Sequence, residues 1–328
     1  RRGQPRPAAL GQAEVGDPAA VALAEGDDAG QGPGAIGPGS GPADDVGIGE
    51  RCFGILACGK RHAREDRRDV LWEELDDASG NRIRSYAQYV RALDPYDHPV
   101  VLHTYPWQQV EVYVPHLGDA SALTGVSLQT MWDHVHEDTR LWVKASRAAG
   151  HPWVVANDEQ GDASTGIPPD GEGDHDALRH RVLWGNLMAG GAGIESYFGY
   201  EYAHNDLNAE DFRSRDRWWD YVRHALTFFE TYLPFPEMQG DNGWGMGDTY
   251  VFSKPGRVYA VYRPHGGATT LDLGGDGATY DVHWYDPRDG GALQQGSVTD
   301  VRAAGGSVSI GTPPAASGPD WVALVRRR

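Results

Sequence analysis

Residues 153–160 read Trp-Val-Val-Ala-Asn-Asp-Glu-Gln, a short apolar run that stops abruptly at four polar residues. Such a run is typical of a strand buried in a parallel sheet, with its C-terminal end open to a polar site. In (β/α) barrels the C-terminal ends of the strands carry the catalytic residues. The run therefore predicts a parallel α/β fold and makes Glu159 the first candidate for a catalytic residue.

Strand and helix patterns alternate along residues 81–232. The helix predicted at 81–93 is amphipathic, with Ile83, Tyr86, Val90 and Leu93 on one face. Further strands are predicted at 99–105, 125–132, 153–156 and 193–197, and further helices at 134–149, 176–189 and 209–232. This order indicates a parallel sheet covered by helices. Because a complete eight-stranded barrel needs about 250 residues, we interpret residues 69–236 as a partial (β/α)8 TIM barrel with the last five βα units.

The pattern changes after Pro236, where short strands follow one another without helices. They are predicted at 250–253, 258–262, 268–273, 279–285, 296–301, 307–310 and 321–325. Turns rich in Gly, Asp and Pro separate them, as in Asp-Pro-Arg-Asp-Gly at 286–290. Regular short strands of this kind indicate an all-β sandwich, which we assign to residues 237–328.

Residues 1–68 have a different composition. Of the first fifty residues, 28 are Gly, Ala or Pro, and the first aromatic residue is Phe53. Such a stretch buries too little apolar area to offset its ordering entropy, so we predict a disordered or non-native-like N-terminal segment. Ser and Thr are almost absent from it, which would also fit a GC-rich gene read in another frame.

The composition argues against several classes of function. The formal net charge is −18, whereas sequence-independent binding of nucleic acid needs a basic face. No run of 18 apolar residues predicts a membrane span, and no signal peptide is visible after the N-terminal arginines. Cys52 and Cys58 alone build neither a disulfide framework nor a zinc site.

Glu159 needs a partner if the chemistry is glycoside hydrolysis. One carboxyl group protonates the leaving oxygen, and the other attacks the anomeric carbon or activates water. Glu73 or Glu74, just before the helix at 81–93, could supply the second group, at the separation of about 5–5.5 Å found in retaining enzymes. The alternative is that Glu73 and Glu74 only complement the dipole at a helix start, and that Glu159 is a solvated loop acid.

Polar and aromatic side chains also follow the other predicted strands. Together they would form a sugar-binding cleft, with aromatic faces beneath the ring and polar groups on its hydroxyls. Each alone is more readily explained as structural, but their shared position favours a site. The predicted substrate-binding residues are His103, Tyr105, Trp107, Gln129, Asn157, Asp158, Glu195 and Tyr197.

A metal site would be an alternative use of His103, His134, His136, Asp158 and Glu159. However, His134 and His136 lie two residues apart at a helix start, and residues two apart on a helix do not share a face. The ligand spacing of an EF-hand calcium loop is also absent. We therefore predict neither a metal nor another cofactor.

The segments 92–106 (ALDPYDHPVVLHTYP) and 153–161 (WVVANDEQG) resemble a bacterial family of glycoside-hydrolase-like TIM barrels. Proteins of this family often carry a C-terminal module classed as a collagen-binding domain. The tail is similar to that module at 252–262 (FSKPGRVYAVY), 284–288 (WYDPR) and 320–322 (DWV). The apiosidase-like barrels of pectin breakdown are relatives in architecture, and the resemblance covers roughly residues 71–328.

The resemblance implies a secreted or periplasmic retaining hydrolase that acts on a plant or microbial polysaccharide. It implies Glu159 as the nucleophile at the end of the seventh strand, and an acid/base at the end of the fourth, where the family tends to read Trp-Asn-Leu-Gly-Glu-Glu. Here Glu73 and Glu74 lack the Asn and Gly before them, and the first three strands are not recognisable. These departures leave two other hypotheses open: a non-catalytic protein that binds a carbohydrate or matrix polymer, and a truncated or frame-disrupted product without activity.

Overall fold

The computed structural model describes residues 80–161, 164, 166, 175–201, 212–241, 249–315 and 319–328. All of the described residues belong to one unit of the chain. Glu73, Glu74 and the segment 1–68 lie outside the described residues, so what is expected of them stays a prediction. Within the described ranges, no helix is long and apolar enough to cross a membrane.

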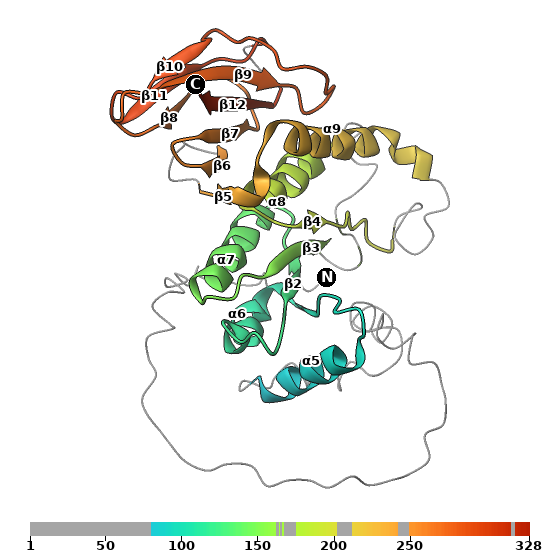
Figure 1. The fold of residues 1–328 in the computed structure, drawn as a ribbon. Helices are drawn as coiled ribbons and strands as arrows, with labels where there is room; N and C mark the ends of the chain where they lie inside the picture. Colours follow the sequence, from blue (N-terminus) through green and yellow to red (C-terminus); the bar gives the residue numbers. More distant parts are fainter. Residues whose placement is uncertain are drawn as a thin grey trace, which may run out of the picture. The chain divides into compact units, whose positions relative to one another are not determined.

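The first part of the described chain is built around a four-stranded parallel sheet with the strand order β1-β2-β3-β4 (Figure 1). Its strands are β1 (Val101–Thr104), β2 (Gly125–Thr130), β3 (Val154–Gln160) and β4 (Gly193–Ile194). The α-helices are α5 (Asn81–Leu93), α6 (Gln109–Tyr113), α7 (Val135–Ala148), α8 (Trp184–Ala189) and α9 (Asp216–Tyr232), with the short helices η1 (Pro106–Gln108), η2 (Val114–His116) and η4 (Phe212–Arg215). Consecutive parallel strands joined through helices confirm the predicted α/β fold, while closure into a barrel stays a proposal.

Two elements differ from the sequence-based expectation in ways that bear on the site. The strand predicted at 153–156 continues to Gln160, so the four polar residues 157–160 lie within β3 rather than after it. The helix predicted at 176–189 begins as a π-helix, η3 (Leu178–Leu183), which α8 continues. The change from apolar to polar residues in the sequence therefore indicates where a strand reaches a polar site. It does not indicate the residue at which the hydrogen-bonded strand ends.

The side of the parallel sheet that faces α6 and α7 is apolar. Val126, Leu128 and Val155 belong to the same core as Trp142 of α7. Tyr113 of α6 meets the ring of Trp142 edge to face, with 5.0 Å between the ring centroids. Burial of such side chains contributes about 1.5–3 kcal/mol each. Because side chains alternate along a strand, this packing turns the remaining side chains of β1, β2 and β3 to the opposite face.

Gly125 begins β2 at a point where the backbone of β3 passes close by. A Cβ atom at this position would lie 2.2 Å from the carbonyl oxygen of Val154. We therefore expect Gly125→Ala to push β2 away from β3 and to lower the free energy of unfolding by about 1–3 kcal/mol, the usual cost of overpacking. Gly193→Ala in β4 is the matched control, because a Cβ there would meet no atom within 4 Å. Urea denaturation followed by circular dichroism measures both variants, and equal losses would contradict the prediction.

The C-terminal part is an antiparallel β-sandwich, as predicted. Its larger sheet has the strand order β10-β9-β12-β7-β6-β5, and its smaller sheet pairs β11 with β8. The elements are η5 (Phe235–Glu237), β5 (Gln239–Gly240), β6 (Tyr250–Lys254), β7 (Val258–Arg263), β8 (Thr269–Asp272), β9 (Thr279–Tyr285), β10 (Asp300–Arg302), β11 (Ser307–Gly311) and β12 (Trp321–Arg327). The strand predicted at 296–301 is limited to β10, and β5 is additional. The domain boundaries at 68 and 236 stay predictions.

Both faces of the larger sheet are buried, which explains why β7 reads as a continuous apolar run. Tyr259 and Val261 belong to the core shared with the smaller sheet. The alternate residues Ala260 and Tyr262 belong to a second core, in which the rings of Tyr262 and Trp184 of α8 stack at 5.0 Å between centroids. Helix α8 contacts both β4 and β6 (Figure 1). The sandwich and the helices of the α/β part therefore share one core.

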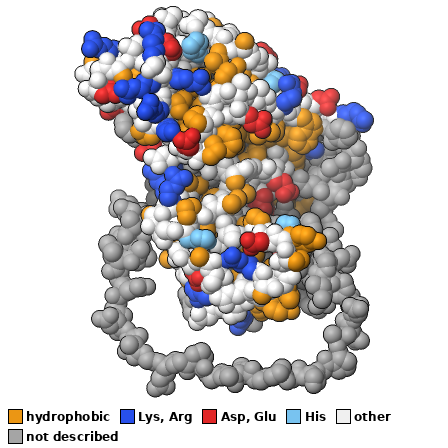
Figure 2. Space-filling view, viewed as in Figure 1, with side chains coloured by type: hydrophobic (Ala, Val, Ile, Leu, Met, Phe, Trp, Pro, Cys, Tyr) orange, Lys and Arg blue, Asp and Glu red, His pale blue; other side chains and the backbone are white. Residues whose placement is uncertain are grey.

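Charge is unevenly distributed over the visible surface. The chain has a formal net charge of −18, yet Lys and Arg side chains gather over the sandwich in Figure 2. Some of them are paired: Arg327 lies 2.6 Å from Asp276, and Arg328 lies 2.9 Å from Asp300. On this part of the surface, basic side chains therefore lie beside acidic ones.

Candidate functional site

Strand β3 contains a β-bulge at Asp158. Leu128 of β2 pairs with Asn157 and Gln129 pairs with Glu159, so Asp158 is the extra residue on β3. In a regular strand, successive side chains point to opposite faces, and a bulge re-aims one of them. Here the carboxylates of Asp158 and Glu159 both contact the same histidine of β1. The bulge therefore brings two neighbouring acids to one face of the sheet.

That histidine, His103, lies between the two carboxylates. Its Nδ1 atom is 3.4 Å from Oδ1 of Asp158, and its Nε2 atom is 3.2 Å from Oε2 of Glu159. Ser127 of β2 donates a hydrogen bond to Oδ2 of Asp158. The Oγ atom of Ser127 also lies 3.3 Å from Nδ1 of His103. The side chains of all three titratable residues are largely buried, so the cluster is compact and mostly shielded from water.

The histidine at the centre of this cluster carries a proton at neutral pH. Burial lowers the pKa of His103, but hydrogen bonds to Asp158 and Glu159 and their negative charges outweigh burial and raise the pKa to about 9. A protonated imidazole has an N–H donor on both ring nitrogens. His103 can therefore donate to both carboxylates while it places a positive charge beside Glu159.

Glu159 is held from its other side by hydrogen bonds that begin in the core. Gln129 donates from Nε2 to Oε1 of Glu159 at 3.1 Å. Gln109 of α6 donates to the backbone oxygen of Gln129 at 2.7 Å, and Trp142 of α7 donates to Oε1 of Gln109, also at 2.7 Å. Because Oε1 faces Gln129 and Oε2 faces His103, the orientation of the carboxylate is fixed before any ligand binds.

The structure brings His103, Gln129, Asp158 and Glu159 together, but it places Asn157 elsewhere. Asn157 is completely buried and donates to Oγ1 of Thr130 at 3.0 Å. Its Oδ1 atom accepts a hydrogen bond from Nε2 of Gln160 at 2.7 Å. These contacts direct the side chain of Asn157 away from the carboxylate cluster, in keeping with its alternate position along β3.

Glu195 and Tyr197 follow β4, and their backbone groups form hydrogen bonds with the side chain of Gln160 of β3. The Nε2 group of Gln160 donates to the backbone oxygen of Glu195 at 2.9 Å, and its Oε1 atom accepts from the backbone N–H of Tyr197 at 3.0 Å. Glu195 is exposed, whereas Tyr197 is buried. In this structure both residues are thus positioned by a buried glutamine rather than by the cluster around Glu159.

Tyr105 and Trp107 form an exposed aromatic pair directly after β1. Their rings are stacked, with 5.0 Å between centroids and an angle of 8° between planes. Trp107 is 73% exposed. Tyr105 lies two residues beyond His103, so the pair begins where β1 leaves the carboxylate cluster. A flat, exposed aromatic surface of this kind suits the apolar face of a sugar ring.

Sequence reasoning did not select Ser127 or Tyr113, which support the cluster. Ser127 lies two residues before Gln129 on β2, so the alternation of a strand is a signal that could have found it. The hydroxyl of Tyr113 lies 3.2 Å from the backbone oxygen of Leu102 and 3.3 Å from that of Ser127. No sequence signal marks Tyr113, because its position depends on how α6 packs beneath the sheet.

The histidines of the alternative metal interpretation are not brought together. His134 is exposed, whereas the buried His136 has its Nδ1 atom 2.9 Å from the backbone oxygen of Gly185. The ring of His136 stacks on Tyr250 at 4.1 Å between centroids. Among the residues that the structure describes, no group of three or more His, Cys, Asp or Glu side chains could hold a metal ion.

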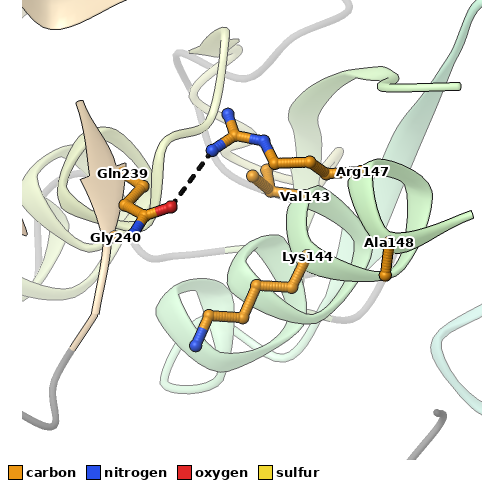
Figure 3. A pocket seen from close by; sticks show the side chains of 6 residues that line it. All are labelled: Val143, Lys144, Arg147, Ala148, Gln239 and Gly240. Atoms are coloured by element: carbon orange, nitrogen blue, oxygen red, sulfur yellow. Dashed lines mark hydrogen bonds between the residues drawn. The ribbon is translucent and has the colours of Figure 1, made fainter. Parts of the chain in front are cut away.

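A cavity of about 220 Å³ lies away from the cluster, between α7 and β5 (Figure 3). Arg147 donates a hydrogen bond to Oε1 of Gln239 across it at 3.3 Å. The C-terminal half of α7 leads into the N-terminal end of β3, so this cavity lies at the end of β3 opposite to Glu159. The lining residues are Val143, Lys144, Arg147, Ala148, Gln239 and Gly240.

The sandwich matches a known family of domains. Residues 241–326 match the family described as "Putative collagen-binding domain of a collagenase". The match covers β6 to β12 and does not extend into the α/β part. No curated protein sequence matches the chain.

Solved structures similar to this chain include glycoside hydrolases. One is a glycoside hydrolase family 5 protein from Bacteroides vulgatus ATCC 8482, with a TM-score of 0.53 and 18% sequence identity, covering 73% of this chain and 57% of that chain. Another is a glycoside hydrolase with a TM-score of 0.47 and 12% identity, covering 75% of this chain and 68% of that chain. The chain thus spans little more than half the length of the first. At this identity the likeness shows that the fold is glycoside-hydrolase-like.

Proposed function

We propose that this chain is a glycoside-hydrolase-like protein that acts on a plant or microbial polysaccharide by a retaining, two-carboxylate mechanism. Glu159 is the proposed nucleophile, and Glu73 or Glu74 is the proposed acid/base. The glycoside-hydrolase-like fold and the location of Glu159 near the C-terminal end of a parallel strand support the proposal. Secretion or export to the periplasm belongs to the same proposal.

The observation that carries the proposal is the environment of the Glu159 carboxylate. A nucleophile for the anomeric carbon must be ionised and correctly oriented. The protonated His103 places a positive charge 3.2 Å from Oε2 of Glu159, and Gln129 fixes the orientation of the carboxylate. In the proposed reaction Glu159 attacks the anomeric carbon while the acid/base protonates the leaving oxygen. The same acid/base then deprotonates a water molecule, which hydrolyses the bond between the sugar and Glu159.

Hydrolysis of a panel of plant and microbial polysaccharides, measured by release of reducing sugar, tests this proposal. Proton NMR of the first product then reports its anomeric configuration. Retention supports the two-step mechanism, whereas inversion would exclude Glu159 as a nucleophile. No release from any member of the panel would count against a hydrolase. In single Glu73→Gln and Glu74→Gln variants, only loss of the true acid/base should spare activated aryl glycosides, which need no protonation.

The stacked pair after β1 yields a prediction about binding. We expect Trp107→Ala to weaken the binding of an oligosaccharide by roughly 5- to 10-fold, or about 1–1.4 kcal/mol, because a stacking surface is lost. Tyr89→Ala is the control, since Tyr89 is a similarly exposed aromatic residue (65%) on α5, outside the proposed cleft. Isothermal titration calorimetry measures both dissociation constants. If both variants bound the sugar as tightly as the unchanged chain, the pair would not be part of the cleft.

A second candidate function is non-catalytic binding of a carbohydrate or a matrix polymer. The match of residues 241–326 to a family described as collagen-binding favours it. A glycan and collagen array combined with the reducing-sugar assay separates the two candidates. A binding protein would retain its ligand on the array without releasing sugar from any soluble substrate.

A further inference from the structure

The cluster on this face of the sheet contains Asp158, a carboxylate for which the proposed reaction has no role. A retaining mechanism uses two carboxyl groups, the nucleophile and the acid/base. Asp158 is neither in the proposal above, yet its side chain is only 21% exposed and lies in the same cluster as Glu159. Regular alternation along β3, with Val155 and Asn157 on the helix side, already places Asp158 on the face of His103. The bulge then brings Glu159 to the same face, beside Asp158.

We propose that Asp158 is a positioning residue that acts on Glu159 through His103. Asp158 holds the ring at Nδ1, which directs the Nε2–H group toward Glu159 and keeps a positive charge beside that carboxylate. The catalytic consequence rests on the proposed function, whereas the contact itself does not. This role differs from the sugar-binding role expected of Asp158 and His103 from the sequence, because each side chain already engages the other.

The protonation of His103 depends mainly on the two carboxylates that lie beside it. Within the described ranges, the ion pairs of His103 are those with Asp158 and Glu159. From β2, the nearby group is the neutral hydroxyl of Ser127, which donates to Asp158. From α6, Tyr113 remains a neutral phenol, because burial and then the charge of Asp158 raise its pKa well above its ordinary value.

Removing the charge of Asp158 should lower the pKa of His103. Burial acts against the protonated form of His103, and the two acids together outweigh it. With Asp158 neutralised, the opposing effect of burial stays while half of the compensating charge is lost. The pKa of His103 should then fall, and at neutral pH the proton beside Glu159 should be less firmly held. The positive charge beside Glu159 would then be lost at a lower pH than in the unchanged chain.

The direct test is an NMR titration of the histidine side chains of the full chain, with His103→Gln to assign the signals. We expect Asp158→Asn to lower the pKa of His103 by about one unit or more, and Asp158→Glu to restore most of the difference. Asp94→Asn is the matched control, because Asp94 pairs with the exposed His98 at 2.9 Å and its loss should not affect His103. An unchanged pKa of His103 in Asp158→Asn would overturn the proposal.

Two further measurements keep the test decisive. If Asp158→Asn does not fold, Ser127→Ala replaces it: loss of the hydroxyl that holds Asp158 should lower the pKa of His103 by a smaller amount, and no change would overturn the proposal. For the catalytic consequence, the alkaline limb of kcat/KM on an activated aryl glycoside, which needs no protonation, should move to lower pH in Asp158→Asn, by about half a unit or more, because His103 loses its proton at a lower pH. A merely structural role would lower kcat/KM equally at every pH. If no glycan is hydrolysed, the proposed function fails, and the titration still decides the role of Asp158.

Discussion

Glu159→Gln is expected to lower kcat on the substrate glycan by ~10³-fold or more, as removal of a nucleophile does in other enzymes. Glutamine has the same shape as glutamate, so its oxygen can still accept a hydrogen bond from Gln129 or His103. Its amide cannot attack the anomeric carbon. Binding of the glycan should change little, because the walls of the site are kept. Reducing-sugar assays measure turnover, and calorimetry measures binding.

Chemical rescue separates a nucleophile from a residue that only supports the fold. In Glu159→Ala, azide can occupy the space of the missing carboxylate and attack the anomeric carbon directly. A single displacement inverts the configuration, so a glycosyl azide with inverted configuration is the expected product. Glu230→Gln is the matched control, because Glu230 is an exposed carboxylate on α9. Full activity of Glu159→Gln, or rescue with retained configuration, would remove Glu159 from the role of nucleophile.

The parallel sheet and the sandwich were predictable because burial leaves a periodic signal in the sequence. Trp153 and Val155 are apolar because they pack in one core with Trp142 of α7, and the alternation of strand and helix favours parallel pairing. Parallel strands end at the same edge of a sheet. The predicted order of strands therefore implies that His103, Gln129 and Glu159 lie close together. The structure joins these three by contacts of 3.1 and 3.2 Å. Their roles in binding and catalysis stay predictions.

Features that depend on contacts between distant residues left no periodic signal. The bulge at Asp158 is a property of the register between β2 and β3, which the sequence of β3 alone does not encode. The strand predicted at 193–197 ends at Ile194, since the backbone of Tyr197 bonds to the side chain of Gln160 instead of to a neighbouring strand. The start of the helix predicted at 176–189 is a π-helix that presents Arg179 to the sandwich.

Arg179 joins this π-helix to the sandwich through a buried ion pair with Asp320, just before β12. The side chain of Asp320 is 0% exposed and that of Arg179 is 2% exposed. Arg179 donates from Nε to Oδ2 at 2.9 Å and from Nη2 to Oδ1 at 3.0 Å, while Tyr262 donates to Oδ2 at 2.7 Å. Burial would raise the pKa of Asp320, but hydrogen bonds and charges from His180 and Arg179 outweigh it and hold the pKa well below its ordinary value.

Asp320→Ala is expected to lower the free energy of unfolding by about 3–5 kcal/mol, because it leaves the charge of Arg179 buried without its main partner. Asp176 also contacts Arg179, but that carboxylate is 46% exposed and lies in the same helical segment. Denaturation with urea, followed by tryptophan fluorescence, measures the loss. The matched control is Asp220→Ala, which breaks an exposed pair with Arg223 and should cost less than about 1 kcal/mol. Equal losses in the two variants would contradict the prediction.

The same carboxylate should make the fold sensitive to acid. A carboxyl group whose pKa is lowered by folding stabilises the protein above its unfolded pKa of about 3.9, and the contribution is lost as the pH falls below that value toward the folded pKa. Between about pH 5 and about pH 3, the stability of the unchanged chain should therefore fall more steeply than that of Asp320→Ala. Parallel slopes would mean that Asp320 is not ionised in the folded protein.

Replacing both partners separates the charge from the shape of this contact. Arg179→Met combined with Asp320→Leu fills similar space and leaves neither charge unpaired, so the double variant should be more stable than Asp320→Ala alone. Tyr262 would still lose the acceptor for its hydroxyl, which limits the recovery by about 1–3 kcal/mol. If the double variant were no more stable than the single one, the unpaired charge of Arg179 would not be the source of the loss. The contacts of Asp320 with Tyr262 and His180 would then be what joins the sandwich to the π-helix.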